Sequence, residues 1–71
     1  MLITRSQRSR IRLEALEGWR AAAQLVSARW QRFLHTEPEM RIFAYASYVA
    51  ALDSEEAAAA YLEAVARPAA A

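Results

Sequence analysis

The sequence has no cysteine, one glycine, two prolines and one histidine among its 71 residues. Without cysteine, the chain can form no disulfide, no thiolate metal site and no cysteine nucleophile. No apolar run approaches the roughly 20 residues needed to span a bilayer, and the N-terminus lacks the apolar core of a secretion signal. We therefore expect residues 1–71 to form one small soluble domain in the cytoplasm.

Lysine and asparagine are also absent, so all nine basic side chains are arginine, while alanine fills about a quarter of the chain. Arginine and alanine have GC-rich codons, whereas lysine and asparagine have AT-rich codons. This alanine-rich composition predicts a bacterial source with a GC-rich genome. It says nothing about function.

The small size of the chain limits its core. At 8.0 kDa, a folded chain buries only about 60% of the surface that it exposes when unfolded. The free energy gained from burying apolar surface then barely exceeds the free energy lost through chain entropy. A protein partner or self-association is therefore expected.

Strong helix formers dominate the sequence, and no segment alternates between apolar and polar residues as a strand would. We predict an all-α fold with one long N-terminal helix over residues 5–35 and two shorter helices over 37–52 and 54–66. Residues 68–71 are expected to be a frayed tail after Pro68.

Capping signals set these predicted boundaries. Thr36 and Glu39 fit a capping box, with Pro38 in the first turn of the second helix. Asp53 and Glu56 form a second box that would start the third helix, and Ser54 is an alternative cap. His35 falls at the end of the first helix, where a cation is favoured by the helix dipole.

Two chain traces fit these elements. The three helices can fold back as a small three-helix bundle, in which case the first 13 residues of the long helix project beyond it. Alternatively, the second and third helices are collinear and form a helical hairpin, with Glu37 to Ala66 antiparallel along the first helix. Residues 1–36 hold seven Arg and two Glu, net +5, and residues 37–71 hold two Arg, five Glu and one Asp, net −4. This charge split favours the hairpin, and it also favours antiparallel dimers in which the acidic half of one chain faces the basic arm of the other.

Apolar residues recur at helical spacing. Counting heptads from Leu16, every a and d position of the first helix is apolar. The candidate core or interface residues are Leu16, Trp19, Val26, Trp30 and Phe33 in the first helix, Ile42, Tyr45 and Val49 in the second, and Tyr61 and Leu62 in the third. These stripes predict that the helices pack on one another or on a partner.

Residues 5–14, which we call the basic arm, are the second candidate site. The candidate contacts to phosphates or other anions are Arg5, Arg8, Arg10 and Arg12. The same Arg- and Ser-rich stretch is also typical of an organelle transit peptide. However, the helical pattern continues without a break into the rest of the chain.

Catalytic chemistry has little support in the sequence. The single histidine has no evident carboxylate partner, no phosphate-binding glycine-rich loop occurs, and neighbouring Glu55 and Glu56 point about 100° apart on a helix. We expect no enzyme activity, no metal site and no cofactor. The leading hypothesis is a non-enzymatic interaction module that assembles or regulates a larger structure, as a homo-oligomer or with a protein partner. The alternative is a nucleic-acid-binding accessory protein, and an amphipathic anchor on anionic membranes is a disfavoured third.

Overall fold

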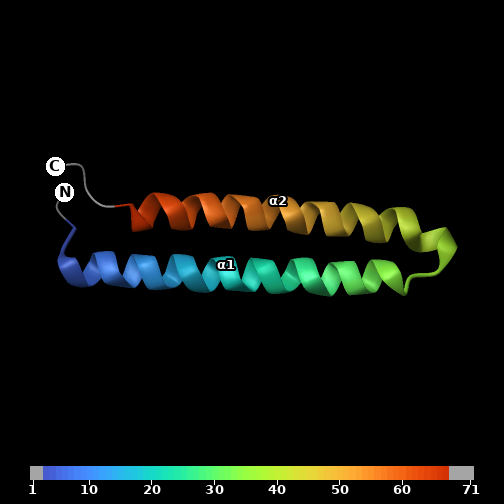
Figure 1. Ribbon diagram of the computed structural model, residues 1–71, viewed down its shortest axis with the longest axis horizontal. Coiled ribbons are helices and arrows are strands. Elements are labelled where there is room, and N and C mark those ends of the chain that lie inside the picture. Colours follow the sequence, from blue (N-terminus) through green and yellow to red (C-terminus); the bar gives the residue numbers. More distant parts are fainter. Residues whose placement is uncertain (1–2, 68–71) are drawn as a thin grey trace.

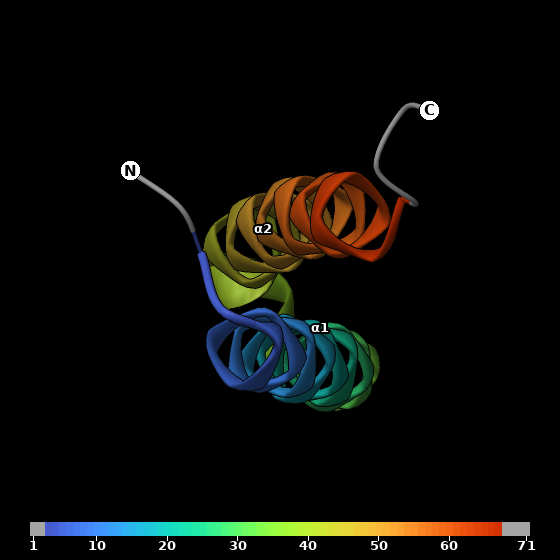
Figure 2. The ribbon, with the colours of Figure 1, turned by 90° about the vertical axis from the view of Figure 1, so that its left-hand side faces the viewer.

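The computed structural model describes residues 3–67, which form a helical hairpin. Helix α1 (Arg5–Leu34) is followed by a single 3-10 turn, η1 (Pro38–Met40), and by helix α2 (Arg41–Ala66). The two long helices run antiparallel and lie side by side (Figure 1), and the end-on view shows a single layer of two helices (Figure 2). Residues 3–67 contain no strand, so the predicted all-α fold is confirmed. The predicted tail, 68–71, lies outside the described residues.

Side-chain hydrogen bonds define both ends of α1. The hydroxyl of Thr4 accepts a hydrogen bond of 3.1 Å from the backbone N–H of Gln7, whose side chain accepts one of 2.9 Å from the backbone N–H of Thr4. This is a complete capping box, which the sequence analysis overlooked. At the other end His35 is the C-cap, and its Nδ1 lies 2.8 Å from the carbonyl oxygen of Gln31.

The predicted capping box of Thr36 and Glu39 is wrong. The Thr36 hydroxyl donates instead to the carbonyl oxygen of Arg32 in the last turn of α1. The same carbonyl also accepts a hydrogen bond of 3.2 Å from the backbone N–H of His35, so both bonds close the last turn of α1. Glu37 is the N-cap of η1 and makes no side-chain capping bond, and α2 begins at Arg41.

The predicted third helix is also wrong, because α2 continues without interruption from Arg41 to Ala66. Asp53 and Ser54 are exposed residues in its interior rather than caps. Each costs only a few tenths of a kcal/mol relative to alanine in a helix, and no glycine or proline occurs within α2. The alanine-rich residues around them easily offset this cost.

A continuous α2 decides between the two predicted traces. The hairpin trace is confirmed, and the compact bundle with a projecting arm is wrong. The start of α1 extends past the end of α2 (Figure 1), and the two helices lie side by side from about Ile11, which lines one shallow hollow with Val65. The later part of the basic arm therefore lies beside α2, and its first turns extend past the end of that helix.

Candidate functional site

Alanine residues form the closest contact between the helices. The buried side chains among residues 3–67 are Ala15, Ala44 and Ala51. Ala22 and Ala58 are half-buried and lie seven residues from Ala15 and Ala51, on the same faces of α1 and α2. Small side chains at this spacing let two backbones approach closely. The seven-residue alanine repeat is visible in the sequence and could have indicated this contact. The candidate core residues were instead chosen from the larger apolar residues beside it.

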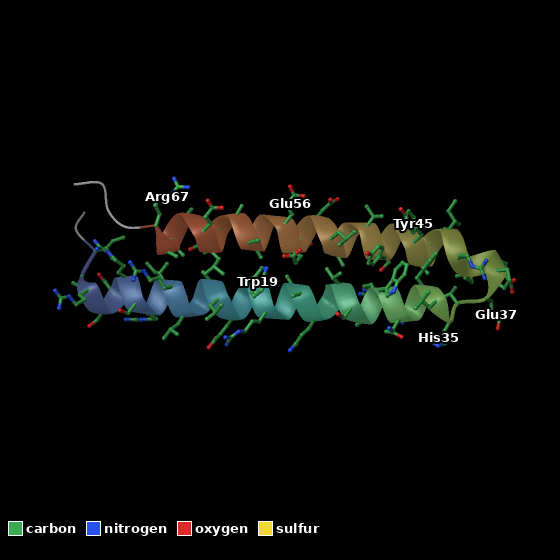
Figure 3. All side chains as sticks on the ribbon, in the orientation of Figure 1. Trp19, His35, Glu37, Tyr45, Glu56 and Arg67 are labelled. Carbon is green, nitrogen blue, oxygen red and sulfur yellow. The ribbon has the colours of Figure 1, made fainter. Side chains whose placement is uncertain are left out.

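One polar contact joins the middles of the two helices. The indole Nε1 of Trp19 donates a hydrogen bond of 2.7 Å to the Glu55 carboxylate oxygen Oε2, and the contact is partly buried. Trp19 points from α1 toward α2 in Figure 3. The contact fixes the register of the helices, because it puts Trp19 level with Glu55. A role for Glu55 in this contact was not predicted from the sequence.

An aromatic cluster lies between the helices near η1, and its members are Trp30, Phe33, Tyr45 and Tyr48. The ring centroids of Trp30 and Tyr48 are 5.0 Å apart, and those of Phe33 and Tyr45 are 5.6 Å apart. The tilted rings have the offset geometry that aromatic pairs prefer. These contacts bring the Trp30 ring against the Tyr48 ring, and the Phe33 ring against the Tyr45 ring, across the two helices.

The hairpin does not bury all of the predicted interface. The half-buried residues are Leu16, Trp19, Val26, Phe33, Val49 and Leu62, and the exposed ones are Trp30, Ile42, Tyr45 and Tyr61. Trp30 is 38% exposed and Ile42 is 74% exposed. Two helices alone therefore cannot cover the apolar stripes that the sequence carries.

Much of the uncovered apolar surface lies on one flank of the hairpin, which we call the open face. On α1 it follows Arg12, Leu16, Arg20, Ala23, Ser27, Trp30 and Leu34, and on α2 it follows Ile42, Tyr45, Val49, Leu52, Glu56, Ala59 and Glu63. The three- and four-residue spacings put each set along one line of its helix. The ring contacts between the two helices bring both lines to the same flank.

The opposite flank is less continuous. Its large apolar side chains, such as Leu25, Phe43 and Tyr61, are separated by small or charged residues. Two shallow hollows lie there. Ile3, Arg8, Ile11, Tyr61, Val65 and Arg67 line the first, and Arg32, Thr36, Met40, Phe43, Ala44 and Ser47 line the second.

All four arginines of the basic arm are exposed. Helical spacing puts Arg5, Arg8 and Arg12 on one side of α1 and Arg10 on the other. Within residues 3–67, Arg67 and Glu63 form an ion pair of 3.4 Å at the end of α2. No ion pair in this part of the chain joins α1 to α2. The opposite charges of the two helices therefore form no direct pairs within the described hairpin.

The described residues bring no three His, Asp or Glu side chains together in a metal-binding arrangement. Neither α1 nor α2 has the length of apolar sequence required to cross a membrane. Comparison with protein-family models, with curated proteins and with solved structures finds no match for the chain.

Proposed function

We propose that the protein is a non-enzymatic helical interaction module that docks on another protein surface through its open face. The observation that carries this proposal is the set of large apolar side chains that the hairpin leaves uncovered there, including Trp30, Leu34, Ile42, Tyr45 and Leu52. Contiguous apolar surface of this kind marks interaction sites in folded proteins. Its role would be to assemble or regulate a larger structure.

The arrangement of charges supports a protein partner. The apolar part of the open face occupies the half of the hairpin nearer η1, and arginine and glutamate residues follow it toward the other end. Interfaces between proteins have such an apolar centre beside a charged and polar rim. Tryptophan and tyrosine, both present in the aromatic cluster, are the residues that most often dominate binding energy.

A photo-crosslinking experiment in the cells that produce the protein tests this proposal. Leu52 and Leu25 are a matched pair, since both are leucines with 36% and 41% exposure, on the open face and on the opposite flank. A benzoylphenylalanine in place of Leu52 should give a covalent protein adduct, and the same group in place of Leu25 should not. Absence of an adduct from Leu52, or equal adducts from both, would contradict the proposal.

A second candidate function is binding to nucleic acid. It is favoured by the exposure of Arg5, Arg8, Arg10 and Arg12, none of which the structure pairs with a carboxylate within residues 3–67. Arginines that contact phosphates release counterions, so affinity should fall steeply with salt, with a log–log slope that approaches the number of phosphates contacted.

Fluorescence anisotropy with duplex and single-stranded DNA, measured over a range of salt concentrations, tests this second function. A variant with all four arginines changed to alanine should lose binding. The matched control changes four other exposed arginines, Arg20, Arg32, Arg41 and Arg67, and so alters the net charge equally. Salt-insensitive binding, or no binding by the unmodified chain, would rule out this function.

A further inference from the structure

The large apolar side chains are displaced from the contact between the two helices. The most buried residues at that contact are alanines, whereas Trp30, Tyr45 and Leu52 lie to one side of it. Helices that pack against one neighbour carry their apolar stripe toward that neighbour. Here the stripes of both helices turn toward the same flank, as they do in four-helix bundles, in which each helix contacts two neighbours.

The accessible surface area of the chain also indicates that a further neighbour covers part of the hairpin. Its accessible surface is 5876 Å². A compact protein of 8.0 kDa is expected to expose about 4,450 Å². The excess, about 1,400 Å², is larger than the roughly 800 Å² that each partner buries in a stable interface of standard size. A second hairpin placed on the open face would cover an area of this order.

Charges on the open face select the orientation of that second hairpin. The register set by Trp19 and Glu55 puts Arg20 of α1 within about 3 Å of Glu56 of α2 along the helix axis, and Arg12 within about 2 Å of Glu63. The basic residues of the face are on α1 and the acidic ones on α2. Glu56 is exposed and points away from α1 in Figure 3, and within residues 3–67 it forms no ion pair in its own hairpin.

We propose that the protein partner of the open face, whose docking role is the function proposed above, is a second copy of this chain. The two hairpins pack face to face about a two-fold axis parallel to the helices, with their η1 turns at the same end. Each α1 then lies antiparallel to α2 of the second copy. Arg12 is opposite Glu63 of that copy, Arg20 is opposite its Glu56, and Leu34 is opposite its Ile42.

The reverse orientation, with the η1 turns at opposite ends, does not bring apolar residues against apolar residues or opposite charges together. It would set α1 against α1 of the second copy, with Trp30 and Leu34 near the basic arm. Apolar side chains would then cover arginines, and burial of an unpaired charge is strongly unfavourable. The sequence order along the open face therefore favours one of the two possible face-to-face dimers.

Light scattering and a spin-label distance test the dimer and its orientation. The chain has no cysteine, so a Glu37→Cys variant carries a single label beside η1. We expect a mass of twice 8.0 kDa and a label-to-label distance on the order of 20–30 Å, set by the width of a four-helix bundle. A monomer overturns the proposal. A dimer whose labels are more than about 45 Å apart, the length of α1, overturns the orientation.

Charge reversal tests the pairing of the named residues. The double variants R12E/R20E and E56R/E63R each bring like charges together across the dimer, so each should dimerise at least tenfold more weakly than the unmodified chain. An equimolar mixture of the two variants restores every pair and should form the heterodimer. Circular dichroism of each variant shows whether it is still helical. Helical variants that dimerise as strongly as the unmodified chain overturn the assigned pairs.

The mass in solution and the Leu52 crosslink together distinguish a wrong dimer from a wrong docking surface. A purified chain that remains monomeric, together with a Leu52 adduct to a different protein in cells, overturns the second copy and retains the docking role of the open face. A dimer in solution with no Leu52 adduct of any kind overturns both, because the dimer would use another surface.

Discussion

Trp19 and Glu55 are 36 residues apart in the sequence, and the 2.7 Å hydrogen bond between the Trp19 indole and the Glu55 carboxylate ties α1 to α2 at mid-length. A hydrogen bond to a charged acceptor contributes about 1.5–3 kcal/mol. Alanine contacts are less specific, since neighbouring alanines have the same shape. This bond therefore has a particular role in fixing the register of the hairpin.

Removal of this hydrogen bond should destabilise the protein. Trp19→Phe removes the donor, and we expect the free energy of unfolding to fall by about 1–3 kcal/mol, because Glu55 is then left half-buried without its partner. Urea denaturation followed by circular dichroism measures this change. Glu17→Gln is the control and should be nearly neutral, because Glu17 is exposed and lies outside the open face. In a double-mutant cycle, Glu55→Ala should add little once Trp19 is phenylalanine. Additive effects would contradict a direct coupling.

The contact at Ala51 should tolerate only a small side chain. Ala51 is 3% exposed, whereas its neighbour Ala50 points about 100° away around α2 and is exposed. Ala51→Leu inserts three extra carbon atoms between the helices and should destabilise the hairpin by about 1–3 kcal/mol. Ala50→Leu changes the helix propensity by the same small amount and should leave the stability nearly unchanged. Thermal unfolding of the two variants measures the difference, and equal melting temperatures would show that the helices do not approach closely at Ala51.

The local features of the chain were largely predictable from the sequence. Composition and periodicity predicted helices throughout, and the start of α1 at Arg5 agrees with the structure. The error at Asp53 arose because a residue that caps helices well is also tolerated inside them at small cost. A capping signal without a neighbouring glycine, proline or change of phase in the apolar pattern is therefore weak.

The arrangement of the two helices was harder to predict. A heptad pattern gives the direction of the apolar stripe on one helix, but not how many neighbours share it. The stripe from Leu16 to Phe33 follows from the sequence, yet only the structure shows that Ala15 is buried between the helices and that Trp30 lies toward one flank. The partner of Trp19 was not predictable, because no local rule relates residues that lie on separate helices.

The continuity of α2 can be tested by whether one substitution, Asp53→Ala, raises or lowers the stability. Asp53 lies in the interior of α2 and is exposed, so Asp53→Ala should raise the stability by a few tenths of a kcal/mol, through the better helix propensity of alanine. If Asp53 were an N-cap, the same change would cost about 1 kcal/mol. Thr4→Ala is the reference for a true cap and should lower the stability by about 0.5–2 kcal/mol. Denaturant titration of the two variants gives both signs, and a loss of stability in Asp53→Ala would contradict an unbroken α2.

The only glycine of the chain offers a stabilising substitution. Gly18 lies within α1 at a negative φ, and a Cβ atom built there would meet no atom within 4 Å. Gly18→Ala should therefore stabilise the protein by about 0.5–1 kcal/mol, because alanine loses less backbone entropy on folding and causes no clash. Ser54→Ala is the comparison, because Ser54 is exposed and lies outside the open face, and helix propensity predicts a gain of roughly half that size. Melting temperatures measured at one protein concentration test both changes. A loss of stability in Gly18→Ala would show that another surface packs closely against α1 at this position.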